Sequence, residues 1–529
     1  MHNPLPSRRA TTICLVIAGA ILLVELLLPL SWDNWVYQTA GYDLVKFGKW
    51  PYTGTWYFNF PGMAYLHAFA ISIFGATDLG FRIFDVLFQI GTCYLLIIAT
   101  RRYISRLATL ITPIVYCLIY TSLAWSAAGQ VDAFVAGFLL AGLLLIRRAF
   151  DARIQLRAVR TFSLFFGGVL VAFCTALRPT YLLFPAALLL LIALDRPRRH
   201  ALPSIFFGCS TGVILPLTPY LFFNGGPYAF YTQALRYGID VYGMMSRSPM
   251  ELWASQRTTI LMVAVYLFLA IVTGIFFMRR NKNVNASHPE VASFDIRLYM
   301  ALIVSCIISV LIMRKFLVSH FLPLLALLSP LIASGITSPI RLTNKRPLGI
   351  AVSAILCLFF AYRLYPRNLV RHFIDGTKSP LGALVYCYDK QASDPRCGYL
   401  AELDAATYLN KIDPNSESIE VVSCYRSYMR VQCNLEGVTK YSRTEALATP
   451  QPNGLFTGYQ QEWRSEYLNT LRAQKPRIIV EADNGFRLGV ANSPLAEAEK
   501  IVGFADFFEH TYERDTAIHG FTFYRRRDG

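Results

Sequence analysis

A series of long, nearly uncharged apolar runs constrains this chain more than any other feature. A helix that crosses a membrane needs about 20 consecutive apolar residues. The clearest runs of about this length are residues 11–30, 79–100, 161–177, 202–222, 258–278, 316–335 and 347–364. Hydrophobic residues make up 54% of the 529 residues and charged residues only 16%, which is too little charge for a soluble protein of this length. The sequence therefore predicts an α-helical polytopic membrane protein.

The net charge of +17 is explained by membrane topology rather than by nucleic-acid binding. Lys and Arg gather in short segments beside the apolar runs, at residues 8–9, 101–106, 147–160, 196–199, 279–282 and 341–346. When all these segments are placed in the cytoplasm, every crossing obeys the positive-inside rule. This places the N-terminus in the cytoplasm and the C-terminus on the periplasmic side of the cell inner membrane. Membrane lipid is an expected partner, and nucleic acid is not.

The same charge asymmetry predicts about eleven membrane spans. They are expected at residues 11–30, 79–100, 106–124, 131–147, 161–177, 179–194, 202–222, 258–278, 298–313, 316–335 and 347–364. Residues 11–30 lack a small-residue cleavage site, so we interpret them as a retained span rather than a signal peptide. Residues 61–75 form only a short apolar run, and a crossing there would move the later basic segments outside. We therefore expect residues 61–75 to lie on the outer membrane face.

The composition changes after about residue 365, where polar residues become frequent and no spanning run remains. Helical patterns at residues 401–411 and 462–473 alternate with strand patterns at 418–423, 477–481 and 518–525, the last of which alternates as an edge strand does. The sequence thus predicts two domains. Residues 1–364 form a transmembrane domain with a periplasmic loop at 31–78, and residues 365–529 form a soluble periplasmic α/β domain.

Four of the eleven cysteines fall in the predicted soluble domain, in a compartment where disulfides persist. Two local disulfides, Cys387–Cys397 and Cys424–Cys433, are the simplest of three connectivities. Zinc binding is the alternative, but the spacing contains no C-x-x-C pair. The other seven cysteines are scattered through the spans, where we expect small buried apolar side chains.

Ionisable and polar residues recur at the outer ends of the predicted spans. Such residues are costly in lipid and usually line a cavity. The early loop and turns contribute Asp33, Tyr37, Asp43, Tyr57, Asn59, Arg82, Asp85, Gln130 and Asp132, and the later ones contribute Arg178, Arg236, Asp240, Arg314, Lys315 and His320. Carboxylates from the early turns and cations from the later turns predict one cleft, which suits a ligand with an anionic headgroup and a reacting neutral part.

Each of these residues also has a structural alternative. Asp33 directly follows an apolar span and can be the N-cap of a helix. Arg82 and Asp85 lie three residues apart on one helix and can neutralise each other. Lys315 can reach lipid phosphates along the membrane surface, and His320 can be a packing residue. No P-loop, G-x-G-x-x-G or H-E-x-x-H motif indicates a soluble enzyme instead.

The first outer loop contains Trp32-Asp33-Asn34-Trp35-Val36-Tyr37, followed by Gly48. The spacing of its Asp, Tyr and Gly resembles the loop of the GT-C membrane glycosyltransferases, in particular the protein O-mannosyltransferase-like enzymes of glycosyltransferase family 39 and the lipid A aminoarabinose transferase. Arg82 matches an Arg that opens the next span in that family, and Asp132 resembles its Asp in the second outer turn. The sequence departs from the family pattern at Asn59 and Phe60, where the family has charged residues.

Later motifs extend the resemblance over nearly the whole chain. Arg178 stands where the family usually has a Lys, and Arg314-Lys315-Phe316 with Ser319-His320 resemble its late basic motif. The resemblance implies the GT-C fold, a polyprenyl-phosphate-linked sugar as donor, a glycan, lipid or protein as acceptor, and inversion at the anomeric carbon.

The resemblance also implies residue roles. Asp33 is expected to be the base on the acceptor hydroxyl, and the donor phosphate is expected to bind Arg178, Lys315, His320 and, more weakly, Arg82. Asp132 would orient one of these cations, or hold a divalent metal beside Asp33; no cofactor is certain. The residues expected to support the site are Tyr37, Asp43, Asn59 and Tyr57. A non-catalytic transporter or scaffold for lipid-linked sugars, and an oligosaccharide polymerase or ligase, stay open as alternatives.

Overall fold

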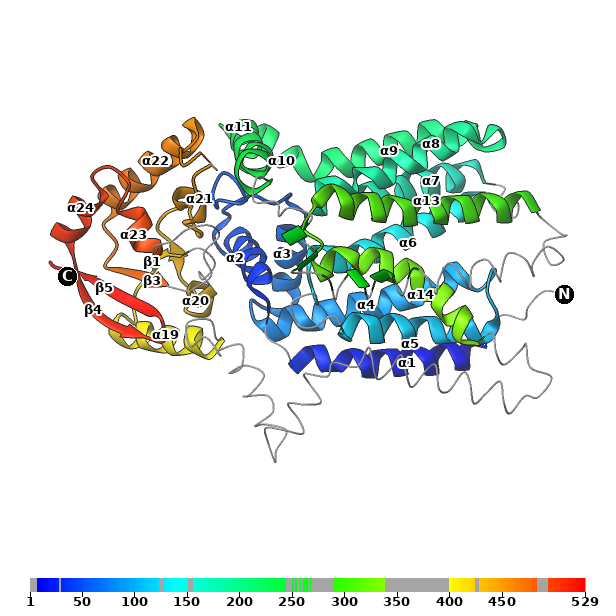
Figure 1. Ribbon diagram of the computed structural model, residues 1–529, viewed down its shortest axis with the longest axis horizontal. Coiled ribbons are helices and arrows are strands. Elements are labelled where there is room, and N and C mark those ends of the chain that lie inside the picture. The colour runs from blue at the N-terminus through cyan, green and yellow to red at the C-terminus, as the bar shows by residue number, and fades with distance from the viewer. Residues whose placement is uncertain are drawn as a thin grey trace, which may run out of the picture. The chain divides into compact units, whose positions relative to one another are not determined.

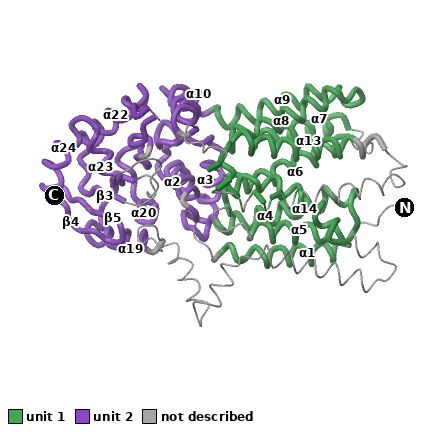
Figure 2. The backbone as a smooth tube through the Cα atoms, viewed as in Figure 1, with its two compact units in different colours: residues 1–27, 82–218, 247–370 green, residues 28–81, 219–246, 371–529 purple. Residues whose placement is uncertain are grey.

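The structure is a computed structural model. It describes residues 7–27, 30–122, 128–150, 156–243, 289–337, 399–423, 428–451, 453–482 and 493–528, with single residues between 250 and 267. The chain forms two compact units, shown in different colours in Figure 2. Unit 1 comprises residues 1–27, 82–218 and 247–370, and unit 2 comprises residues 28–81, 219–246 and 371–529.

Unit 1 is a bundle of apolar helices (Figure 1). Its main helices are α1 (Arg8–Leu22), α4 (Asp78–Thr100), α5 (Arg106–Ser122), α6 (Val131–Ala149), α7 (Arg157–Leu177), α8 (Leu183–Leu194), α9 (Leu202–Ile214), α13 (Pro289–Met313) and α14 (Leu322–Thr337). Helices α6, α7 and α9 approach closely through glycines, as membrane helices often do. A Cβ atom at Gly208 of α9 would lie only 2.1 Å from the Phe165 carbonyl oxygen of α7.

Within the described residues, six helices are long and apolar enough to cross a membrane. They are Arg8–Leu26, Asp78–Thr100, Arg157–Leu177, Arg196–Phe222, Phe294–Met313 and Val318–Thr337, and shorter apolar helices run over Gly62–Phe74, Arg106–Thr121 and Pro179–Leu194. These helices confirm the polytopic α-helical fold. The number of eleven spans stays a prediction, because the expected span at 347–364 and most of that at 258–278 lie outside the described residues.

One end of the unit 1 bundle collects basic segments that are far apart in the sequence. Arg147 of α6 donates to the Ala99 carbonyl at the end of α4, and Arg160 of α7 lies 3.2 Å from His200 before α9. The segments around residues 101–106, 147–160 and 196–199 therefore share one end of the bundle, as the positive-inside rule requires of a membrane protein. The side of the membrane on which this end lies stays a prediction.

Unit 2 contains a five-stranded sheet in the order β2-β1-β3-β5-β4. Its strands are β1 (Ser418–Val422), β2 (Glu436–Gly437), β3 (Ile478–Ala482), β4 (Tyr512–Ile518) and β5 (Phe521–Arg526), and its longer helices are α2 (Trp32–Phe47), α3 (Gly62–Phe74), α19 (Tyr399–Ile412) and α22 (Gly458–Gln474). The α/β pattern predicted for the C-terminal part is confirmed, with β1 parallel to both β2 and β3.

One strand differs from the sequence expectation. The segment 518–525 was predicted as an edge strand, but β5 lies between β3 and β4, and β4 forms the edge. The cause is a tight turn at His519 and Gly520, both with positive φ, which pairs Ile518 with Phe521 and folds β4 and β5 into a hairpin.

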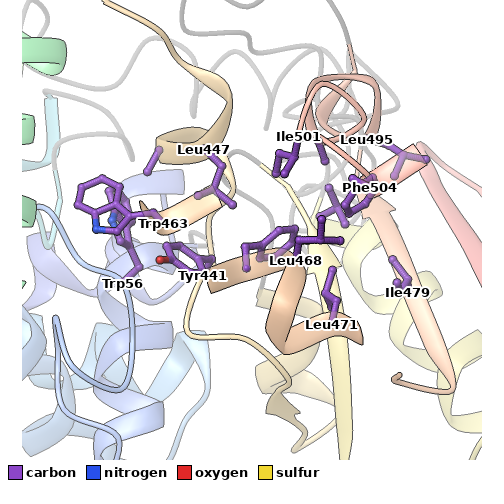
Figure 3. Packing of buried hydrophobic residues seen from close by; sticks show 14 of the residues in the cluster. Trp56, Tyr441, Leu447, Trp463, Leu468, Leu471, Ile479, Leu495, Ile501 and Phe504 are labelled. Atoms are coloured by element: carbon purple, nitrogen blue, oxygen red, sulfur yellow. The ribbon is translucent and has the colours of Figure 1, made fainter. Parts of the chain in front are cut away.

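The core of unit 2 is built from three separate parts of the sequence. Figure 3 shows Trp56, from the predicted periplasmic loop, packed with Tyr441 and Trp463 of the C-terminal part, and Tyr237 belongs to the same cluster. Residues 365–529 therefore do not enclose their own core, and the compact units differ from the predicted domain boundary. The sequence could not show this, because a loop residue that completes a distant core has no local signature.

The predicted Cys424–Cys433 disulfide stays a prediction, because Cys424 lies outside the described residues. Cys433 is described as a free thiol whose Sγ lies 3.5 Å from the Ala406 carbonyl oxygen. Burial raises the pKa of the Cys433 thiol to about 12, so it is a poor nucleophile at neutral pH. Cys387, Cys397 and Cys424 lie outside the described residues, and the Cys387–Cys397 pair stays a prediction.

Candidate functional site

In unit 1, Asp132 is the centre of a polar cluster at the N-terminal end of α6. Its side chain is completely buried, with Oδ2 3.1 Å from Arg178 Nη2, and Oδ1 accepts a hydrogen bond from the Tyr181 hydroxyl. Arg178 reaches Asp132 because Pro179 follows it. A residue before proline avoids helical geometry, so α7 ends at Leu177 and Arg178 is extended, with φ −156° and ψ 132°.

Two further basic residues lie near Arg178. His320 belongs to a short 3-10 helix, Val318–Phe321, which precedes α14, and its side chain is buried. The positive charges of Arg178 and Lys315 both act on the His320 ring. The structure therefore brings together the three residues that were predicted from later turns of the chain to contact a phosphate.

The backbone on both sides of Lys315 is strained. Arg314 and Phe316 have φ values of 49° and 48°, in the left-handed region that residues other than glycine rarely adopt. Such conformations cost free energy and persist where the surrounding structure enforces them, often at functional sites. The strain ends α13 at Met313, whose Sδ lies 2.7 Å from Arg178 Nη1, and it holds Lys315 between α13 and the 3-10 helix of His320.

The cluster of Asp132, Arg178, Lys315 and His320 has an electrostatic preference for an anion. Asp132 is the one carboxylate in this set, and its charge is matched by Arg178. Lys315 adds a second positive charge, and His320 Nδ1 is buried with no hydrogen-bond partner among the described residues. Preorganised donors of this kind stabilise negative charge that develops on a leaving group.

Arg82 takes a different place from the one predicted. Its side chain is completely buried between Glu25 and Asp85, with Nη1 3.9 Å and 4.0 Å from their carboxylates. Nη1 also donates to the Ala128 carbonyl at 3.1 Å. This arrangement is close to the structural alternative, in which Arg82 and Asp85 neutralise each other. A completely buried guanidinium does not present itself to a lipid-borne phosphate, so the expected contact between Arg82 and the donor does not fit this structure.

In unit 2, Asp33 lies in the first turn of α2 and its side chain is exposed, whereas the residues that follow it on the helix are buried. The N-cap position is Ser31, so Asp33 is not the cap of this helix. The helix dipole favours a negative charge in the first turn. Tyr37, one turn further, is buried with its ring 6.3 Å from that of Tyr57. Burial raises the pKa of Tyr57 far above its ordinary value, so this phenol stays neutral.

The expected supporting residues Asp43 and Asn59 have structural contacts. Asp43 is buried and accepts hydrogen bonds from Arg430 Nη1 and Nη2 at 2.7 and 2.9 Å, and from the Thr55 hydroxyl at 2.7 Å. The Asn59 carbonyl accepts from the Tyr52 hydroxyl at 2.6 Å. Asp43 thus ties the predicted periplasmic loop to the C-terminal part of unit 2.

The described residues contain no group of three His, Cys, Asp or Glu side chains that could hold a metal ion. Asp132 contacts Arg178 through Oδ2 and Tyr181 through Oδ1, which fits an Asp that orients an arginine. A divalent metal held by Asp33 and Asp132 stays a prediction.

Sequence reasoning missed Tyr181 and Arg430. Tyr181 lies in a 3-10 turn three residues after Arg178, and Arg430 lies in α20 (Tyr428–Gln432), hundreds of residues from its partner Asp43. Neither residue belongs to a motif. The short spacing between Arg178 and Tyr181 was the only local signal, and the Asp43–Arg430 contact had none.

Comparison with solved structures places the fold among known membrane proteins. ArnT from Cupriavidus metallidurans, solved in complex with undecaprenyl phosphate, superposes over 97% of both chains with a TM-score of 0.57 at 12% sequence identity. An oligosaccharyltransferase from Archaeoglobus fulgidus, solved in the apo form, matches 89% of this chain and 69% of its own with a TM-score of 0.50 at 13% identity.

No protein-family profile and no curated protein sequence matches the chain, so the likeness lies in the fold rather than in the sequence. Both structural neighbours have the fold that the sequence motifs predicted. The chain has the GT-C fold of membrane glycosyltransferases, with an apolar helical bundle and a C-terminal α/β part.

Proposed function

We propose that the protein is a membrane glycosyltransferase that transfers a sugar from a polyprenyl-phosphate donor to a glycan, lipid or protein acceptor. The observation that carries this proposal is the cluster of Arg178, Lys315 and His320 around the buried Asp132. The GT-C fold supports it, and so does the undecaprenyl phosphate bound by the similar protein ArnT. In this proposal the protein crosses the cell inner membrane several times, with its basic end in the cytoplasm.

The cations would act on the leaving group. When the bond between the sugar and the donor phosphate breaks, negative charge develops on a phosphate monoester, which needs no general acid. Arg178 can donate two parallel hydrogen bonds to it, while Lys315 acts as a point charge. His320 offers a further nitrogen, because its Nδ1 is not used by the described residues. Asp132 holds the Arg178 guanidinium in one orientation and so reduces its reorganisation during the reaction.

Asp33 would be the base that takes the proton from the acceptor hydroxyl. An inverting displacement needs one such base, and the acceptor oxygen attacks the anomeric carbon as the phosphate leaves. Its exposed carboxylate, at the start of α2, is accessible to an acceptor. The buried side chains of Tyr57 and Tyr37 would form the floor beneath it.

A transfer assay tests the proposal. Purified full-length protein in lipid nanodiscs would be incubated with a panel of undecaprenyl-phosphate-linked hexoses and pentoses, together with cell-envelope glycans, lipids and proteins as acceptors. We expect one donor to release undecaprenyl phosphate in step with transfer of its sugar, with inverted anomeric configuration. Tight donor binding without any release would instead favour a transporter or scaffold. Release from oligosaccharide donors only would favour a polymerase or ligase.

A matched pair of variants tests the base. Asp33→Asn removes the base and should abolish release while donor binding persists. Asp506 is also an exposed Asp in the first turn of a helix, α24 (Phe504–Thr511), so Asp506→Asn controls for the loss of one such charge. Equal activity of the Asp33→Asn and Asp506→Asn proteins would exclude Asp33 as the base.

A further inference from the structure

The turn that presents Asp132 is held by side chains from two neighbouring helices. The Gly129 amide donates to the Tyr120 hydroxyl of α5 at 2.8 Å. Arg82 of α4 donates to the Ala128 carbonyl at 3.1 Å, and Gln89 of α4 donates to the Ala133 carbonyl at 3.3 Å. The backbone on both sides of Asp132 is therefore anchored from outside its own helix.

The turn needs this external support. Gly129 has φ 69°, so the chain reverses there in the left-handed region. The N-cap residue of α6 is Gln130, and its side chain makes no capping hydrogen bond, although capping side chains usually fix the start of a helix. The position of Asp132, in the first turn after this cap, thus depends on contacts with α4 and α5.

The supporting side chains form one connected network. The Tyr120 hydroxyl donates to Asp85 at 2.8 Å, and Gln89 Nε2 donates to the other Asp85 oxygen at 2.9 Å. Tyr116 donates to Gln89 Oε1 at 2.6 Å. All of these side chains are buried. Asp85 therefore fixes both Tyr120 and Gln89, which each hold one side of the Asp132 turn.

The charges of the network are also enclosed. Arg82 lies between Glu25 and Asp85, and none of the three side chains is exposed by more than 1%. Ionisable groups inside a membrane domain are costly and usually mark function. Because these three side chains are buried, they can act on a ligand only through the residues that they contact. Arg82 contacts the backbone of the turn that leads to Asp132, through the Ala128 carbonyl.

We propose that Arg82, Asp85 and Tyr120 are positioning residues for the donor-phosphate site. They fix residues 128–133, so that Asp132 holds Arg178 in the orientation that binds the phosphate. The identity of the bound phosphate in this inference rests on the proposed function. The contacts that hold residues 128–133 do not depend on it. A small shift of the turn lengthens the 3.1 Å contact between Asp132 and Arg178, so that the guanidinium is held less firmly in this orientation.

The first test reads the position of the turn without any ligand. The Asp132→Cys side chain is expected to be buried and to react slowly with a small maleimide. Mass spectrometry of the full-length protein measures the fraction labelled at this position. Adding Tyr120→Phe removes the acceptor of the Gly129 amide, and we expect labelling to rise about fivefold or more. Tyr299 of α13 donates to the Leu327 carbonyl in the same unit, so Tyr299→Phe is the matched control and should leave the rate unchanged. Equal labelling with and without Tyr120→Phe overturns the proposal.

The second test is a double-mutant cycle on the affinity for undecaprenyl phosphate. We expect Tyr120→Phe to weaken binding about tenfold, and the double variant with Asp132→Asn to bind no worse than Asp132→Asn alone, because both changes act through one contact. Gln89→Met removes the contact with the Ala133 carbonyl, and its effect on affinity should also be non-additive with that of Asp132→Asn. This variant replaces Tyr120→Phe in the cycle if Tyr120→Phe fails to fold. Additive losses overturn the proposal. If the wild type binds no polyprenyl phosphate, the proposed function fails, and the labelling test still decides the positioning role.

Discussion

The buried ion pair between Asp43 and Arg430 offers the sharpest test of how unit 2 is assembled. The two hydrogen bonds of 2.7 and 2.9 Å join α2 to α20, and both side chains are at most 3% exposed. Arg430→Met keeps most of the side-chain volume but leaves the Asp43 carboxylate buried with only Thr55 as a partner among these contacts. Breaking one side of a buried pair costs about 3–5 kcal/mol.

The effect can be measured by thermal unfolding in nanodiscs. For a unit of this size, a loss of about 3–5 kcal/mol lowers Tm by roughly 10 °C. Trp35 stacks on Tyr428, which begins α20, with ring centroids 5.4 Å apart, so its fluorescence reports on the same contact. Combining Arg430→Met with Asp43→Leu should recover much of the loss, because no buried charge is then left without a partner.

A surface pair provides the control. Arg527 Nη1 lies 3.4 Å from Glu513 Oε2, and both side chains are more than half exposed, at 52% and 57%. Arg527→Met should cost less than about 1 kcal/mol. If Arg430→Met were as stable as Arg527→Met, the ion pair would not hold the loop and the C-terminal part together, and the structural role given to Asp43 would be wrong.

The same contact changes what a truncation can show. Removing residues 365–529 leaves Asp43 without Arg430 and exposes the loop residues Trp35 and Trp56, which pack on the C-terminal part. We therefore expect a truncated protein to lose the structure of the loop that carries Asp33. Such a deletion therefore does not test the role of the C-terminal part separately from that of the loop.

Three further outcomes are expected. Burial raises the pKa of Glu420 to about 7 from the ordinary 4.5, so between these pH values the folded protein holds a proton that the unfolded chain releases. The free energy of unfolding should therefore fall by about 3 kcal/mol as pH rises from about 4.5 to 7. Urea titrations at several pH values should show this fall, and Glu420→Gln should remove it. Arg178→Lys should weaken undecaprenyl phosphate binding about tenfold, since Lys cannot form the paired hydrogen bonds, and unchanged affinity would remove Arg178 from the phosphate site. A cysteine introduced at the exposed Leu455 should react with an impermeant reagent in intact spheroplasts, and protection there would reverse the proposed topology.

The sequence alone determined the class of the fold. Runs of apolar residues and basic segments between them specify a multi-pass helical protein, because each helix satisfies its own backbone hydrogen bonds and each charge avoids lipid. Helix and strand patterns in the C-terminal part were equally local, and α19, β1, α22 and β3 appear where they were predicted.

Only the tertiary structure decided which of the polar residues lie together. Arg178, Lys315 and Asp132 meet because Pro179 ends α7 and a strained turn ends α13, and the sequence showed their order but not their contacts. In the sequence, Arg82 was also a candidate for a phosphate contact, although a weaker one than the later basic residues. In the structure its side chain is buried between Glu25 and Asp85. Whether a charge is buried in a network or presented to a ligand depends on which helices pack around it, and that packing is set by side chains distant in the sequence.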